Sequence, residues 1–128
     1  MKKSIFLIIF VISLFLNLYG YSAIEIIPEL VEFGRKNISR YNFIKKGIVE
    51  IICGDGSKGY SGFDGRFDKI LASASAKELP LAWKQQLKIG GKIVASIKDS
   101  IWVFEKKPNG QFKAKEYPGF VFVPLISL

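Results

Sequence analysis

The chain has 128 residues, enough for one small domain, and 19 basic against 11 acidic residues give a formal net charge of +8. Its one cysteine, Cys53, excludes an intrachain disulfide, and the lack of histidine excludes Cys/His metal clusters and histidine general bases within this chain. The basic residues are scattered among acidic ones without an arginine-rich run, which predicts a solvated surface rather than a specific nucleic-acid site.

The first stretch, residues 1–20, is strongly apolar. Lys2 and Lys3 are followed by no charge up to Ile24, and residues 5–16 are the most apolar part. Three interpretations stay open: a secretory signal, a short membrane span, or an internal helix of a larger domain at a truncated start. Each makes residues 1–20 an apolar N-terminal helix, set apart from a domain over residues 21–128.

The next stretch, from Tyr21 to Tyr41, predicts a strand, a turn and a helix. β-type residues lead into Pro28, whose fixed φ and missing N–H suit the first turn of a helix. Apolar residues then recur at helical spacing over residues 28–40. Glu25 falls near the carboxyl end of the strand, where a carboxylate can accept both hydroxyls of a nucleoside ribose. The alternative is an exposed strand-end glutamate.

A second strand is predicted over residues 48–53, where a nearly continuous apolar run indicates burial on both faces and makes Cys53 a buried thiol. Gly54, Asp55 and Gly56 end this strand. The glycines let the backbone turn sharply and come close to a ligand, and Asp55 can accept a hydrogen bond.

The remaining pattern predicts a mixed α/β sheet. A strand over residues 67–76, a helix over 78–87 with Trp83 inward and a strand over 92–97 come first. A final pair of strands, over 100–107 and within GFVFVPLISL at 119–128, is joined through Pro108–Asn109–Gly110 and is predicted to be antiparallel. The predicted fold class is therefore α/β, with parallel strands first and an antiparallel pair at the end.

Several of these pieces occur together in one order: Glu25, GDG at 54–56, FDKILASASAKELP at 67–80, LKIGGKIVASI at 87–97 and FVFVPL at 120–125. In this order they resemble the protein-L-isoaspartate O-methyltransferase family, from about Tyr21 to Leu125. The resemblance implies a seven-stranded Rossmann-like sheet, mainly parallel with an antiparallel C-terminal hairpin. It also implies methyl transfer from S-adenosylmethionine to isoaspartyl carboxylates of proteins, a repair reaction of the cytoplasm.

The same resemblance assigns three cofactor-binding residues. Glu25 would hold the ribose hydroxyls of S-adenosylmethionine, while Asp55 and Gly56 would lie against the adenine, with Asp55 accepting from its amino group. No catalytic residue and no metal ligand is assigned.

The family's glycine-rich loop, first strand and acceptor-binding region have no counterpart in the sequence, because counting back from Glu25 reaches Met1 first. We therefore expect the first strand to be missing, with a gap beside the strand at 22–26, and a truncated chain that is inactive alone. Holding donor and acceptor in line contributes roughly 7–11 kcal/mol to such a reaction.

Two other functions remain as hypotheses. Residues 1–20 favour a membrane-anchored or exported, non-enzymatic interaction domain. The net charge favours non-specific nucleic-acid binding, with Trp83 and Trp102 stacking on bases, although both tryptophans lie in apolar patterns typical of a core.

Overall fold

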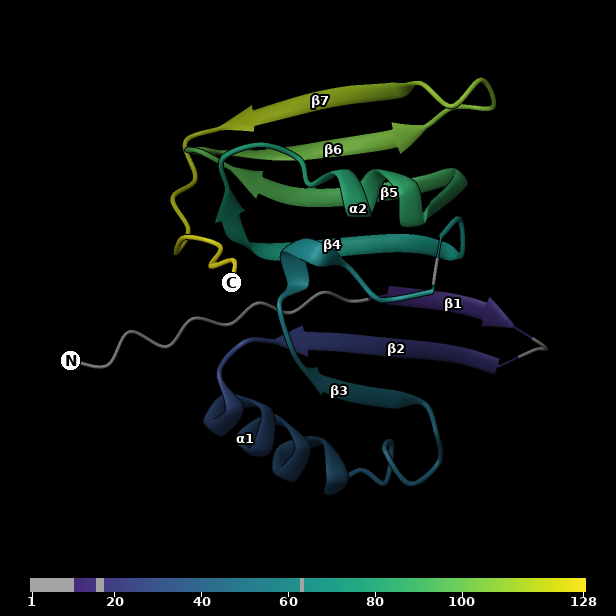
Figure 1. Cartoon of the computed structure of the whole chain (residues 1–128), viewed down its shortest axis with the longest axis vertical. Helices are drawn as coiled ribbons and strands as arrows, with labels where there is room; N and C mark the ends of the chain where they lie inside the picture. The colour runs from purple at the N-terminus through teal and green to yellow at the C-terminus, as the bar shows by residue number, and fades with distance from the viewer. Residues whose placement is uncertain (1–10, 16–17, 63) are drawn as a thin grey trace.

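One mixed sheet carries the described strands of the chain (Figure 1). The computed structural model describes residues 11–15, 18–62 and 64–128. The strands are β1 (Val11–Phe15), β2 (Leu18–Glu25), β3 (Val49–Cys53), β4 (Phe67–Ala76), β5 (Leu87–Ile97), β6 (Ser100–Lys106) and β7 (Phe112–Pro118). The helices are α1 (Pro28–Ser39), the short 3-10 helix η1 (Gly56–Lys58) and α2 (Leu81–Gln86).

The strand order is β3-β2-β1-β4-β5-β6-β7. The pairs β2/β3 and β4/β5 are parallel, as the strand–helix–strand pattern predicts, and β5, β6 and β7 form an antiparallel meander. The predicted mixed α/β sheet with an antiparallel C-terminal hairpin is confirmed. Antiparallel pairs outnumber parallel ones because β1 also runs against both of its neighbours.

Strand β1 is the main departure from the expected N-terminus. Residues 11–15 and 18–20 are extended rather than helical, while residues 1–10 and 16–17 of that stretch lie outside the described residues. The position expected to be empty beside β2 is filled, since Val11–Phe15 pairs with β2 on one side and with β4 on the other. A strand between two partners satisfies its backbone hydrogen bonds on both sides. No helix among the described residues is long and apolar enough to span a membrane.

The end of the chain also differs from the prediction. The last strand is Phe112–Pro118, whereas residues 119–128 form only one bridge, between Ser75 and Pro124. The tight turn at Pro108–Gly110 pairs Lys106 with Phe112 and so starts the return strand at once. That strand ends at Pro118, and Gly119, which follows it, adopts a φ of 92°. Residues 119–128 then cross the carboxyl tip of β4.

The expected burial of Cys53 is wrong, because its side chain is exposed. Strand β3 is an edge strand of the sheet, and Ile51 is its one buried residue. An apolar run therefore did not mean burial on both faces here. Helix α1 packs against β3 on the side of Ile51, where Arg35 donates to the Ile51 carbonyl oxygen at 2.8 Å.

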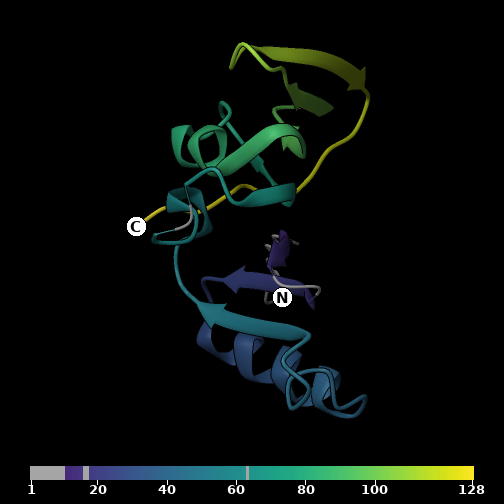
Figure 2. The same cartoon turned by 90° about the vertical axis from the view of Figure 1, so that its right-hand side faces the viewer.

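The main core lies between α2 and the strands β4 and β5. Its buried members are Phe67, Ile70, Ala72, Ala74, Trp83, Leu87, Ile93 and Ala95. Small alanines on β4 let Trp83 pack closely, and Trp83 is 1% exposed, as its predicted inward position requires. Helix α2 is shorter than expected, since Pro80 precedes its first residue instead of lying inside it. Figure 2 shows α2 standing against one side of β4 and β5.

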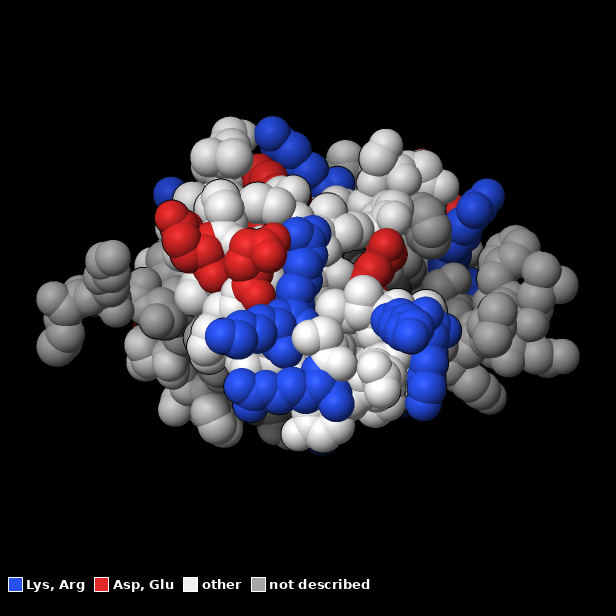
Figure 3. Space-filling view, turned by 90° about the horizontal axis from the view of Figure 1, so that it is seen from below, with Lys and Arg blue, Asp and Glu red and all other residues white. Residues whose placement is uncertain are grey.

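Charges of both signs meet on the surface around α1 (Figure 3). The helix carries Glu29 near its start and Lys36 in its last turn, which matches the helix dipole. Arg35 and Glu32 form an exposed ion pair at 2.6 Å. Such a mixture supports a solvated surface over an electrostatic site for nucleic acid.

Candidate nucleoside site

The carboxyl tips of β2 and β3 lie side by side. Glu25 is in register with Cys53, and the Gly54 N–H donates to the Glu25 carbonyl oxygen at 3.0 Å. Ligands of α/β sheets bind at such carboxyl ends. The fold therefore brings the segments of Glu25 and Asp55 to one edge of the sheet.

Glu25 is buried, with 6% of its surface exposed. Its Oε1 accepts a hydrogen bond from the Ile27 N–H at 2.9 Å, just before α1, whose N-cap residue Ile27 has no side-chain cap of its own. A carboxylate at a helix N-terminus is stabilised by the helix dipole. In this structure Glu25 therefore serves the start of α1, and the exposed-glutamate alternative does not hold.

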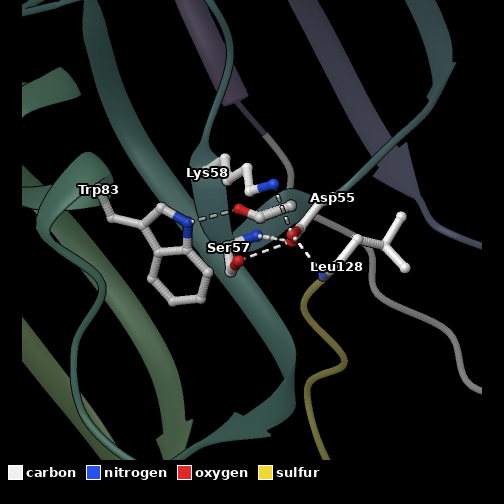
Figure 4. A network of polar contacts seen from close by, with 6 residues as sticks. Asp55, Ser57, Lys58, Trp83 and Leu128 are labelled. Carbon is white, nitrogen blue, oxygen red and sulfur yellow. Dashed lines mark hydrogen bonds and ion pairs between the residues drawn. The ribbon is translucent and has the colours of Figure 1, made fainter.

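Asp55 is the centre of a small polar network (Figure 4). Its Oδ1 accepts from the Ser57 N–H at 3.0 Å and from the Ser57 hydroxyl at 2.6 Å. Its Oδ2 accepts from the Leu128 N–H at 2.9 Å and lies 3.7 Å from Lys58 Nζ. Burial raises the pKa of Asp55, but the hydrogen bonds from Ser57 and Leu128 and the charge of Lys58 outweigh it, so the pKa lies below the ordinary 3.8. Asp55 is thus a fixed, ionised acceptor at neutral pH.

This network makes stability depend on pH in the acid range. Because the folded-state pKa of Asp55 is depressed, its contribution to the free energy of unfolding is present above 3.8 and is lost as the pH falls through the lower folded value. We expect Asp55→Asn to reduce the loss of stability between about pH 6 and about pH 3. Urea unfolding of the unchanged chain and of Asp55→Asn at both pH values measures this loss of stability. Equal losses in the two proteins would contradict the prediction.

Gly56 lies beneath the network and is fixed by α2. It is buried, and its carbonyl oxygen accepts from Trp83 Nε1 at 2.8 Å. This bond ties η1 to the main core (Figure 4).

Gln86, at the end of α2, holds the next part of the loop. Its Oε1 accepts from the Tyr60 N–H at 2.9 Å and its Nε2 donates to the Tyr60 carbonyl oxygen at 2.7 Å. Gln86 is 5% exposed. Gly59 makes this approach possible, because it has a φ of 67° and a Cβ on it would lie 2.3 Å from Gln86 Oε1. We call these contacts of Gln86 with Tyr60 and Gly59 the amide clamp.

A cavity of about 390 Å³ opens between the tip of β3 and the clamped loop. Its walls are Ile24, Glu50, Ile52, Gly54, Asp55, Gly59, Tyr60 and Ser61. Of the predicted site residues, Asp55 is in this wall, whereas Glu25 and Gly56 are not among the lining residues. Burial, together with the charge and hydrogen bond of Glu50, raises the pKa of Tyr60, which keeps its hydroxyl protonated. The volume falls in the range of small-ligand pockets.

A second cavity, of about 450 Å³, lies where residues 119–128 cross the tip of β4. Its lining residues include Ser57, Ser75, Lys77, Glu78, Pro124 and Ser127. Ser57 of η1 lines this cavity, while Asp55, its hydrogen-bond partner, lines the first. The hydrogen bond between Asp55 and Ser57 therefore links the walls of the two cavities.

Sequence reasoning missed Ser57, Tyr60 and Gln86. A serine two residues after an aspartate is a signal for a local side-chain turn and could have indicated the Ser57 contact. Nothing local distinguishes Gln86, because its partner Tyr60 lies 26 residues away. Among the described residues, no group of three or more acidic or cysteine side chains is placed to hold a metal ion.

Comparisons with known proteins agree on one family. The sequence model of protein-L-isoaspartate(D-aspartate) O-methyltransferase matches residues 11–128. A protein-L-isoaspartate O-methyltransferase of Methanopyrus kandleri is 36% identical over 107 residues, which are 80% of this chain and 46% of that protein. One of Pyrococcus horikoshii is 40% identical over 109 residues, 81% of this chain and 48% of that protein.

The fold has a solved counterpart. A putative protein-L-isoaspartate O-methyltransferase of Plasmodium falciparum, in complex with S-adenosyl-L-homocysteine, superposes with a TM-score of 0.72 at 26% identity. The superposition covers 82% of this chain and 51% of that one. The chain thus spans about half the length of the relatives that it matches.

Proposed function

Because the chain belongs to the protein-L-isoaspartate(D-aspartate) O-methyltransferase family, we propose that it forms the nucleoside-binding part of an S-adenosylmethionine-dependent enzyme. The reaction is methyl transfer to isoaspartyl carboxylates of proteins, a repair of damaged chains. The observation that carries the proposal is Asp55, a fixed, ionised acceptor in the wall of a ligand-sized cavity at the tip of β3.

In this proposal Asp55 accepts a hydrogen bond from the adenine amino group, and Gly56 keeps the backbone close to the ring. Glu25 accepts from the ribose hydroxyls. Two contacts bear on the fit: Asp55 Oδ2 now accepts from the Leu128 N–H, and Glu25 Oε1 accepts from the Ile27 N–H. A carboxylate oxygen has two lone pairs, so Asp55 Oδ2 can accept a further hydrogen bond beside the one from Leu128.

S-adenosylmethionine supplies a sulfonium methyl group that a carboxylate oxygen can accept. Transfer requires the donor and acceptor to be held in line, a contribution of roughly 7–11 kcal/mol. The chain spans about half of its relatives' length, so we propose that these 128 residues alone hold the nucleoside without transferring methyl groups. We propose that the function is cytoplasmic, because S-adenosylmethionine is supplied there.

Calorimetric titration with adenosine and with S-adenosylhomocysteine tests the proposal. We expect similar affinities for the two ligands, because the residues of this proposal contact the nucleoside and not the amino-acid part of the cofactor. Asp55→Asn should weaken both about 10- to 150-fold, since a hydrogen bond to a charged acceptor contributes about 1.5–3 kcal/mol. Glu116→Gln, on β7, is the matched control and should bind as the unchanged chain does. Binding that Asp55→Asn leaves intact would contradict the assignment, and methyl turnover by the purified chain would overturn the expected inactivity.

A further inference from the structure

The two oxygens of Asp55 are held in different ways. Oδ1 accepts from the Ser57 N–H at 3.0 Å and from the Ser57 hydroxyl at 2.6 Å. Oδ2 accepts from the Leu128 N–H at 2.9 Å. Lys58 Nζ lies 3.7 Å from Oδ2, beyond hydrogen-bond distance. Each carboxylate oxygen offers two lone pairs, so the described contacts fill Oδ1 and leave one place on Oδ2.

The Asp55 carboxylate has little freedom to turn. Its side chain is 6% exposed, so water cannot readily replace a lost partner. The Ser57 hydroxyl is the one side-chain hydrogen-bond donor that the described residues bring to this carboxylate, since its other hydrogen bonds come from backbone N–H groups. Without the hydroxyl, Oδ1 would keep a single hydrogen bond and the carboxylate could rotate.

Ser57 acts on the first cavity from outside it. Asp55 is in the wall of the cavity at the tip of β3, whereas Ser57 is not among its lining residues and lines the second cavity. A ligand in the first cavity therefore meets Asp55 and not Ser57. Any effect of the Ser57 hydroxyl on that ligand must pass through the orientation or the charge of the Asp55 carboxylate.

We propose that Ser57 is a positioning residue for base recognition: by holding Oδ1, its hydroxyl leaves Oδ2 as the oxygen that accepts from the 6-amino group of adenine. This inference rests on the proposed function, because it deepens the role given there to Asp55. It adds a prediction of selectivity. A purine without a 6-amino group has no donor for Oδ2, so the Ser57 hydroxyl should matter for adenosine and not for purine riboside.

Calorimetric titration of the full chain with adenosine and with purine riboside, which lacks the 6-amino group, tests the proposal. The unchanged chain should bind adenosine about 10- to 150-fold more tightly, which is what a hydrogen bond to a charged acceptor contributes. Ser57→Ala should lower this ratio of affinities at least about threefold, because a hydrogen bond weakens steeply when its geometry is lost. The affinity for purine riboside should stay unchanged.

Three further variants accompany Ser57→Ala. Ser57→Thr keeps the hydroxyl and should retain the ratio of the unchanged chain. Ser57→Cys carries a weaker donor, so its ratio should fall between those of the unchanged chain and Ser57→Ala. Ser39→Ala is the matched control, because the Ser39 hydroxyl donates to the Lys36 carbonyl oxygen at the end of α1 and its loss should change neither affinity.

The ratio should also depend on pH. The hydrogen bonds from Ser57 lower the pKa of Asp55, so loss of the hydroxyl raises that pKa. The selectivity for adenosine should therefore begin to fall at a higher pH in Ser57→Ala than in the unchanged chain. Lys58, the charged group beside Asp55 in the described part of the chain, is the same in both proteins.

The possible failures are distinguishable. Equal binding of both nucleosides to the unchanged chain would overturn the role of Asp55, and this inference with it. Selective binding by the unchanged chain, with the same ratio in Ser57→Ala, would overturn the positioning role of Ser57 alone.

Discussion

Replacing Gly59 with alanine is expected to lower the free energy of unfolding by about 2–6 kcal/mol, from backbone strain of about 1–3 kcal/mol and two lost hydrogen bonds of about 0.5–1.5 kcal/mol each. The strain arises because Gly59 has a φ of 67°. The hydrogen bonds are lost because the new Cβ would lie 2.3 Å from Gln86 Oε1. Gln86 is buried, so its amide cannot move into water to avoid the collision.

Gly62 provides the matched control. It also has a positive φ, of 77°, but nothing lies within 4 Å of a Cβ placed there. Gly62→Ala should therefore cost only the strain, about 1–3 kcal/mol. Urea unfolding measures both variants, and the double variant Gly59→Ala/Gln86→Ala should cost less than the sum of its parts. Equal losses for Gly59→Ala and Gly62→Ala would show that the amide clamp contributes nothing.

Truncation of Trp83 is expected to have the second large effect. Trp83→Ala should lower the free energy of unfolding by about 3–5 kcal/mol, because the indole fills the core and no described residue can replace it. Trp83→Phe keeps most of the volume but leaves the Gly56 carbonyl oxygen without its donor, a cost of about 1–3 kcal/mol. It should also loosen η1, which the indole N–H holds at 2.8 Å.

Trp102→Ala is the comparison for Trp83. Trp102 is half-buried and stacks on Phe104 at 5.8 Å between ring centroids. Its loss should cost clearly less than that of Trp83, and hydrogen exchange at Ser57 and Lys58 should rise in Trp83→Phe only. If both tryptophans cost the same, the main core is not centred on α2.

Local patterns predicted the elements around the site well. Pro28 marked the start of α1, and the run at 67–76 marked β4 to the residue, because fixed φ and β-branched or small apolar residues act locally. Local patterns also predicted the two strand ends, so Glu25 and Asp55 were correctly expected near neighbouring strand tips. Their side-chain partners were not predictable, since Leu128 reaches Asp55 from 73 residues away.

Where the prediction was wrong, contacts between segments far apart in the sequence determined the structure. Residues 11–15 are apolar enough for a helix, yet as β1 they pair with both β2 and β4. Cys53 lies in an apolar run, yet the strand order puts β3 at an edge. A local sequence pattern does not show which strands a segment pairs with, or whether that segment lies at the edge of a sheet.

The central claim is that the tips of β2 and β3 hold a nucleoside. The most direct measurement is the map of backbone amide shifts of the chain during titration with adenosine. The claim predicts the largest shifts at Gly54, Asp55, Gly56 and Ile27, with a smaller response in Asp55→Asn. Shifts confined to the cavity beside Trp102 and Glu116, with none at the two tips, would contradict it.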